Sequence, residues 1–218
     1  MRILALEFSS AQRSAAVVQA PGPGIDWMEQ EAVQSGAANT PLALVDESLR
    51  RAGLEREQIE TLAVGLGPGS YTGIRAAIAL AQGWQLGRAV RLLGLSSAEC
   101  LAAQAQADGW RGPVAVVVDA QRGEFYLANY ELTSSTWREL EPLRLASAAA
   151  VTDCHVNGQP LIGPDLTHSF PQAHNVWPRA GTLGKIALTR NDFIPGENLQ
   201  PIYLRQTSFV KAPPSRLL

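Results

Sequence analysis

The sequence has few of the residues that build redox-active or metal-binding sites. It contains two cysteines, Cys100 and Cys154, and no Cys-x-x-Cys pair. Its three histidines, His155, His168 and His174, do not have the spacing of a metal site. We therefore expect two reduced thiols, with Cys100 on a helix and Cys154 in a loop, and we expect no metal centre.

Charge and long apolar runs are also scarce. Asp, Glu, Lys and Arg make up 17% of the chain, and the formal net charge is −2 at pH 7. A protein that grips a nucleic-acid backbone usually presents a basic face. The sequence lacks that face and any aromatic–basic platform, which argues against a direct RNA-binding module.

The apolar run Ile3–Leu6 is too short for a signal peptide, and no segment has the length of a membrane span, so we expect a cytoplasmic protein.

The sequence does contain alternating strand and helix signals. In the first half, helices are expected to begin at Thr40-Pro41, at a glycine-rich turn and at Ser96, the last with a capping box through Glu99. The apolar runs of that half predict strands at Ile3–Leu6, Ala15–Val18, Trp27–Val33, Thr61–Val64 and Val90–Leu93.

The second half starts with a pattern that repeats the first. Val114–Val118 ends at Asp119, a polar turn follows, and Glu124–Tyr130 returns, just as the first strand ends at Glu7 before its own polar turn. This repetition predicts two related lobes, residues 1–108 and 109–218. Signals weaken after Leu132, where only a short strand at 160–165 and a short helix at 183–189 are expected.

The glycine-rich turn lies between the strand Thr61–Val64 and a helix. Unpaired N–H groups at a helix start attract anions, and glycine allows positive φ and close backbone approach. The segment Gly65–Ser70 has neither the Lys-Ser or Lys-Thr pair of a Walker loop nor a G-x-G-x-x-G fingerprint. The residues leave two interpretations open: an anion site, or a structural turn with close helix packing.

The complete string from Gly67 to Arg75, GPGSYTGIR, resembles the G-P-G-S-[FY]-T-G-[LI]-R signature of the bacterial TsaB (YeaZ) family. The segment Pro201–Arg205 is similar to the P-x-Y-L-R ending of that family. This resemblance implies an α/β protein of two related lobes, of the actin–sugar kinase–heat-shock chaperone (ASKHA) type. In that fold, each lobe offers a hairpin with a carboxylate across an interlobe cleft.

The resemblance also implies a function without independent catalysis. TsaB-like proteins bind and activate a TsaD-like catalytic subunit, which transfers threonylcarbamoyl to N6 of the adenosine 3′-adjacent to the anticodon in tRNAs reading ANN codons. It implies a TsaE-like ATPase as a further partner, a homodimer when the partner is absent, contact with tRNA only through the complex, and no required cofactor. The catalytic relative carries a His-x-x-x-His metal site, whereas the corresponding segment here, Ala37–Leu42, has no histidine.

The helix after the glycine turn, expected to run to about Leu86, has an apolar arc wider than one sheet-facing stripe requires. This helix has two possible placements. Either it is buried deep in its own lobe, or one of its sides packs on its own sheet while the other side packs on another subunit. The resemblance favours the second interpretation. The candidate interface residues are Gly73, Ile74, Ala77, Ile78, Ala81 and Trp84. We expect a charge at Ala77 or Ala81 to abolish partner binding and to leave the fold largely intact.

The candidate cofactor-binding residues are Glu7, Ser9, Ser10 and Asp119, which are either a vestigial nucleotide cleft or ordinary polar turn residues. The first strand ends in Glu7-Phe8-Ser9 where the family usually has Asp-Thr-Ser. The longer carboxylate and the bulky ring would crowd a phosphate, so at most weak binding of ATP or ADP is expected. The alternative function is a stand-alone ATPase or small-molecule phosphotransferase that uses Asp119 and Glu7 on a Mg-nucleotide.

Overall fold

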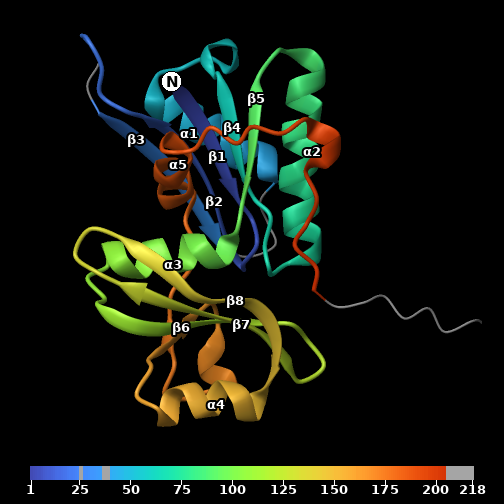
Figure 1. Ribbon diagram of the computed structural model, residues 1–218. Coiled ribbons are helices and arrows are strands. Elements are labelled where there is room, and N and C mark those ends of the chain that lie inside the picture. The colour runs from blue at the N-terminus through green and yellow to red at the C-terminus, as the bar shows by residue number, and fades with distance from the viewer. Residues whose placement is uncertain (25–26, 36–39, 205–218) are drawn as a thin grey trace, which may run out of the picture.

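The computed structural model describes residues 1–24, 27–35 and 40–204, which form two lobes, each built on a five-stranded sheet (Figure 1). The first sheet consists of β1 (Arg2–Glu7), β2 (Gln12–Gln19), β3 (Met28–Ser35), β4 (Thr61–Gly65) and β5 (Arg91–Leu95). The second sheet consists of β6 (Gly112–Asp119), β7 (Glu124–Leu132), β8 (Trp137–Ser147), β9 (Leu161–Gly163) and β10 (His174–Asn175).

The helices lie on the faces of these sheets. They are α1 (Pro41–Ala52), α2 (Tyr71–Gly87), α3 (Ser97–Ala107), α4 (Ala148–Val156) and α5 (Ala180–Leu188), with short 3-10 turns η1 (Arg56–Gln58), η2 (Leu166–His168) and η3 (Gly196–Asn198). Within the described residues, no helix is both long enough and apolar enough to cross a membrane.

The two sheets share one topology. The strand orders are β3-β2-β1-β4-β5 and, read in the matching direction, β8-β7-β6-β9-β10. In each sheet the first strand forms an antiparallel hairpin with the second and pairs in parallel with the fourth. The repeat that the sequence shows as strand, carboxylate, turn and strand is therefore a repeat of the whole sheet topology.

The first sheet is buried on both faces, which explains the continuous apolar runs of its strands. Leu4 and Leu6 of β1 pack with residues of α1 and α2 on one face. Ile3 and Ala5 point to the other face, where they pack with residues of α3 and α5. Side chains alternate between the faces because successive residues of a strand point in opposite directions.

Two helices join the lobes. Cys100 and Ala103 of α3 pack on the first sheet, while Leu101 and Ala105 of the same helix pack with residues of the second sheet. After β10 the chain returns to the first lobe, where α5 lies on β1 and β2 (Figure 1). Residues 109–218 are therefore not confined to the second lobe.

The segment after Leu132, where sequence signals are weak, contains elements that the sequence did not predict, among them β8 and α4. Cys154 lies on α4 rather than in a loop, so that expectation is wrong. The side chains of β8 do not alternate clearly between buried and exposed, because most of them are exposed.

Ser96 caps α3 as predicted. The carboxylate of Glu99, which was expected to complete a capping box, instead accepts hydrogen bonds from Arg190 Nη2 at 2.7 Å and from Trp137 Nε1 at 3.4 Å. The segment 36–39 and Arg205 of the predicted ending lie outside the described residues.

Helix α2 turns its wide apolar arc inward. Ile74, Ala77 and Ala81 have no exposed surface, and Ile78 is 6% exposed. A Cβ on Gly73 would overlap the carbonyl oxygen of Phe8. The half-buried Trp84 packs against the same core.

The predicted interface residues therefore pack on the chain's own core. The expectation that they face a partner on the outer side of α2 is corrected accordingly. The arc is wide because α2 packs on two elements: the first sheet and the segment around η3. Gln82 Nε2 donates to the Gly196 carbonyl at 2.8 Å, and Gln85 Oε1 accepts from the Gly196 N–H at 2.9 Å. Leu199 belongs to the same buried cluster as the apolar residues of α2.

The carboxylate of Glu7 is buried at the end of β1, and it forms no ion pair with any cation among the described residues. Glu7 Oε1 accepts from the Ser9 N–H, and its Oε2 accepts from Ser97 Oγ, each at 2.9 Å. Ser97 Oγ in turn accepts from the Gly67 N–H at 3.1 Å. This chain of hydrogen bonds ties β1 to the glycine turn and to the start of α3. Burial raises the pKa of Glu7 above its ordinary value of 4.5, and the hydrogen bonds from Ser9 and Ser97 offset part of that rise.

Introducing a charge at the core side of α2 will unfold the protein rather than leave it intact. We expect Ala81→Arg to lower the free energy of unfolding by about 3 kcal/mol or more, because it buries an unpaired charge and overfills a packed site. The matched control is Ala79→Arg, at an exposed position of the same helix, which should change it by about 0.5 kcal/mol or less. Urea unfolding followed by circular dichroism measures both. Equal stability of the two variants would contradict the assigned orientation of α2.

The buried Glu7 will make stability depend on pH in a defined direction. Because its folded-state pKa lies above the unfolded value, its favourable contribution is complete below pH 4.5 and is lost as pH rises through the folded pKa. Glu7→Gln cannot ionise. We therefore expect the free energy of unfolding of Glu7→Gln, relative to the unmodified chain, to increase from pH 4 upward and then level off. A difference that stays constant or decreases over a pH series of urea titrations would contradict this assignment.

Candidate functional site

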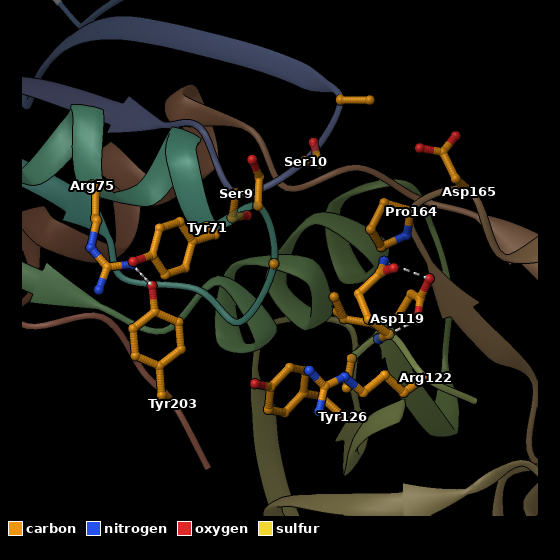
Figure 2. A pocket seen from close by; sticks show the side chains of 16 residues that line it. Ser9, Ser10, Tyr71, Arg75, Asp119, Arg122, Tyr126, Pro164, Asp165 and Tyr203 are labelled. Carbon is orange, nitrogen blue, oxygen red and sulfur yellow. Dashed lines mark hydrogen bonds between the residues drawn. The ribbon is translucent and has the colours of Figure 1, made fainter. Parts of the chain in front are cut away.

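A cavity of about 930 Å³ lies where the two lobes face each other. The first lobe lines it with the β1–β2 turn, Ser9–Ala11, and with the start of α2, Gly69–Tyr71. The second lobe contributes the β6–β7 turn, Val118–Arg122, and the residues Pro164 and Asp165 after β9. The tail adds Tyr203 (Figure 2). The cavity thus brings together the equivalent hairpin turns of both lobes.

The glycine turn packs tightly against the β1–β2 turn. The Ser70 N–H donates to the Ser9 carbonyl at 2.6 Å, and Ser70 Oγ caps α2 by accepting from the Gly73 N–H at 3.2 Å. Gly69 has φ +145°, and a Cβ there would overlap the Ser9 carbonyl. Close packing, one of the two interpretations of these glycines, is therefore what the structure describes at Gly69 and Gly73. Binding of an anion by the turn stays a prediction.

The β6–β7 turn holds its carboxylate in a local hydrogen-bond pattern. Asp119 Oδ1 accepts from the Gln121 N–H at 2.6 Å, and Oδ2 accepts from Gln121 Nε2 at 3.0 Å. Gln121 and Arg122 both adopt the left-handed conformation, with φ of 65° and 61°. Asp165 has φ 53° and is the other non-glycine residue with positive φ in the described part of the chain. All three of these residues line the cavity.

An aromatic and cationic cluster stands at one end of the cavity. The Arg75 guanidinium carbon lies 3.6 Å from the centroid of the Tyr71 ring and 5.2 Å from that of Tyr203. Arg75 Nη1 also donates to the Tyr203 hydroxyl, and the two rings stack with centroids 6.0 Å apart (Figure 2). Burial raises the pKa of Tyr203, while the positive charge of Arg75 acts in the opposite direction.

The structure separates the candidate cofactor residues that the sequence grouped. Ser9, Ser10 and Asp119 line the cavity, whereas Glu7 lies behind it with no exposed surface. Sequence reasoning missed Tyr71, Arg75, Arg122, Tyr126 and Tyr203 as lining residues. The i, i+4 spacing of Tyr71 and Arg75 was the available signal, and nothing in the sequence linked that pair to Tyr203, 128 residues beyond Arg75.

The outer side of α2 is a second exposed feature, which we call the exposed stripe: Thr72, Ala79, Gly83 and Leu86. Three of these four residues are small, and Leu86 is 91% exposed. The exposed Arg75 lies on the same side of the helix, three residues after Thr72 and four before Ala79. A Cβ built at Gly83 meets no atom within 4 Å. Elsewhere in the described part of the chain, no group of three or more His, Cys, Asp or Glu residues could hold a metal ion.

The chain is similar in sequence to proteins of tRNA modification. A family model described as TsaD, tRNA N6-adenosine threonylcarbamoyltransferase, matches residues 34–185. The tRNA threonylcarbamoyladenosine biosynthesis protein TsaB of Escherichia coli K12 is 37% identical over 90 residues, which are 41% of this chain and 39% of that protein. The TsaB proteins of Haemophilus influenzae and Bacillus subtilis are 33% identical over 87 residues and 31% identical over 88 residues. Those matches span 40% and 39% of this chain, and 37% of each relative, so well under half of each curated protein is matched.

The fold is similar to that of a solved structure. YeaZ from Pseudomonas aeruginosa superimposes with a TM-score of 0.78 at 23% sequence identity, covering 93% of this chain and 99% of that one. The predicted fold class, an α/β protein of two related lobes of the ASKHA type, is thereby confirmed. The family model covers more than half of the chain. Curated TsaB proteins are 29–37% identical to the chain over the matched residues. The chain belongs to the family that the TsaD model describes, and within it to the TsaB (YeaZ) proteins.

Proposed function

We propose that the chain is an accessory subunit that binds a TsaD-like catalytic subunit and supports transfer of threonylcarbamoyl to tRNA. The acceptor would be N6 of the adenosine 3′-adjacent to the anticodon in tRNAs that read ANN codons. The names of the curated relatives, tRNA threonylcarbamoyladenosine biosynthesis proteins, support this proposal. In this role the chain favours the active conformer of the catalytic subunit by binding that conformer better than the others.

The observation that carries the proposal is the exposed stripe of α2. Small residues at Ala79 and Gly83, on the side of α2 that also carries the exposed Arg75 one turn earlier, let a helix of a partner approach closely, and Leu86 offers an apolar side chain to bury. The opposite side of the same helix is fixed in the core, so partner binding requires no rearrangement of α2. The stripe belongs to α2 in the first lobe and lies on the side of the helix opposite the residues that pack in the core.

The same stripe can accept a second copy of this chain. We therefore propose that a homodimer forms when the catalytic subunit is absent and that the catalytic subunit displaces one copy. A TsaE-like ATPase would join the resulting complex, and tRNA would bind to the assembly in the cytoplasm.

The interlobe cavity suits ligand binding better than phosphotransfer. The rival function needs two carboxylates on a Mg-nucleotide, but Glu7 is buried away from the cavity and Asp119 is engaged by Gln121. We propose that the cavity holds ATP or ADP weakly and does not turn it over. Calorimetric titration with ATP and Mg²⁺ separates the two functions, since tight binding with hydrolysis would favour the phosphotransferase.

A charge on the exposed stripe will disrupt the proposed interface without unfolding the chain. We expect Ala79→Arg to weaken binding of the catalytic subunit about 30-fold or more, because the arginine side chain prevents close helix approach at a desolvated contact. Ala149→Arg, at an exposed alanine of α4 in the other lobe, is the matched control and should bind normally. Biolayer interferometry with the TsaD-like subunit measures both. Unchanged affinity for Ala79→Arg would refute this docking surface.

A further inference from the structure

Asn129 interrupts an apolar row on the side of β7 that faces α4. Alternate residues of a strand point to the same side, and Phe125 and Leu127 pack with Val151 of α4. Asn129 comes two residues later and is 5% exposed. Its Nδ2 donates to Glu141 Oε2 at 2.8 Å, but its buried Oδ1 has no hydrogen-bond partner among the described residues. Because an unpaired buried acceptor destabilises a fold, a polar residue at this position calls for an explanation.

Strand β8 is irregular opposite this residue. Glu141 is the strand partner of Asn129, and the register of the β7–β8 pair shifts on both sides of them. The shifts arise because β8 has an extra residue on each side of Glu141. Such β-bulges redirect side chains and are frequent beside binding sites. Here the irregularity accompanies the contact between the Glu141 carboxylate and the Asn129 amide.

A pocket of about 340 Å³ is lined by this pair and by the C-terminal part of α4. Besides Asn129 and Glu141, its lining includes Arg144 of β8 and both Asp153 and Cys154 of α4. It shares no lining residue with the interlobe cavity. A volume near the lower end of the range for ligand pockets suits a small molecule.

The charged groups of this pocket suit a ligand that carries both a cation and an anion. Two carboxylates, those of Glu141 and Asp153, lie with the C-terminal end of α4, which carries partial negative charge. Asp153 forms no ion pair within residues 1–24, 27–35 and 40–204. Arg144 is the cation, and its Nη2 lies 3.7 Å from Glu141 Oε2, which is longer than a hydrogen bond. Its guanidinium is therefore able to donate to a ligand.

The thiol of Cys154 shows that these charges act at one place. Burial raises the pKa of this thiol above its ordinary value of 9.0. The positive charge of Arg144 opposes that rise, whereas the negative charges of Glu141 and Asp153 add to it. Because electrostatic effects weaken with distance, all three charged groups lie near the same thiol.

We propose that this pocket binds a small zwitterion of the α-amino acid class. The ammonium group of the ligand donates to Glu141, to Asp153 and to the unpartnered Oδ1 of Asn129. An ammonium has three N–H donors, and these three acceptors satisfy them. The carboxylate of the ligand accepts from the guanidinium of Arg144, whose fork of N–H groups matches a carboxylate. This inference is independent of the proposed function, since neither tRNA nor a partner subunit takes part.

The test is an NMR titration of the full ¹⁵N-labelled chain with three probes added separately. L-Alanine carries both charges, ethylamine only the cation and acetate only the anion. We expect L-alanine to shift the side-chain amide of Asn129 and the backbone resonances of β8 and α4, with a Kd about fivefold or more below that of either other probe. No shift of these resonances by L-alanine, or equal affinity for all three probes, would overturn the inference. Shifts caused by Mg²⁺ but not by L-alanine would assign the carboxylates to a metal ion and would also overturn it.

Two variants at exposed residues separate the two charges of the ligand. We expect Asp153→Asn and Arg144→Gln each to weaken L-alanine binding about fivefold or more. The first should also weaken ethylamine and leave acetate unchanged, and the second should do the reverse. The matched controls are Asp192→Asn and Arg138→Gln, at exposed residues that do not line the pocket, and both should bind as the unmodified chain does. Unchanged L-alanine binding by both pocket variants would refute the assignment.

The variant Asn129→Leu tests the buried amide itself. We expect it to lose L-alanine binding while its urea midpoint of unfolding stays the same or rises, because the unpaired acceptor is replaced by an apolar group of similar size. Circular dichroism follows the unfolding. A lower midpoint together with unchanged binding would show that Asn129 serves the fold alone, which would contradict the proposal. Since the pocket is separate from α2, that result would leave the proposed docking of the catalytic subunit unaffected.

Discussion

The structure depends on the close packing of the glycine turn against the end of β1. Gly69 and Gly73 bring the backbone of the turn and of α2 against the carbonyl oxygens of Ser9 and Phe8, where a side chain on either glycine would overlap. This packing fixes the start of α2 at the cavity and turns the apolar arc of the helix into the core. The exposed stripe and the Tyr71–Arg75 pair both take their positions from it.

The two lobes are joined by packed helices as well as by the chain itself. Helix α3 contributes to the buried clusters of both sheets, and α5 carries the second half of the chain back to the first sheet. The facing hairpin turns are therefore held at the cavity by α3, which packs on both sheets, and by α5, which packs on α3 and on the first sheet. Helix α2 links this cavity to the outer surface of the first lobe, because Arg75 lines the cavity and lies one turn from Ala79 of the stripe.

Local signals predicted much of the first lobe. The strand runs, the Thr40-Pro41 helix start and the repeated hairpin with a terminal carboxylate all depend on neighbours in sequence, and the structure contains each of them. The side of α2 that faces outward could not be predicted in this way, because the η3 segment that covers part of its arc lies more than a hundred residues away. The periodicity showed a wide apolar face without showing which element covers it.

The same limit applies to the site. The direction of Glu7 depends on Ser97, 90 residues further along the chain, and the aromatic cluster depends on Tyr203. Strand β8 escaped prediction because its exposed, charged side chains give no apolar alternation. Residues whose roles depend on tertiary neighbours were therefore misplaced or missed, whereas residues whose roles depend on the local chain were found.

The central claim is that this chain supports a catalytic subunit without performing the chemistry itself. The most direct measurement is a reconstituted tRNA threonylcarbamoylation assay with the TsaD-like and TsaE-like subunits, run with this chain present or omitted, beside an ATP hydrolysis assay on this chain alone. We expect modification that requires this chain, together with no hydrolysis of ATP by the isolated chain. Undiminished modification when the chain is omitted would contradict the account.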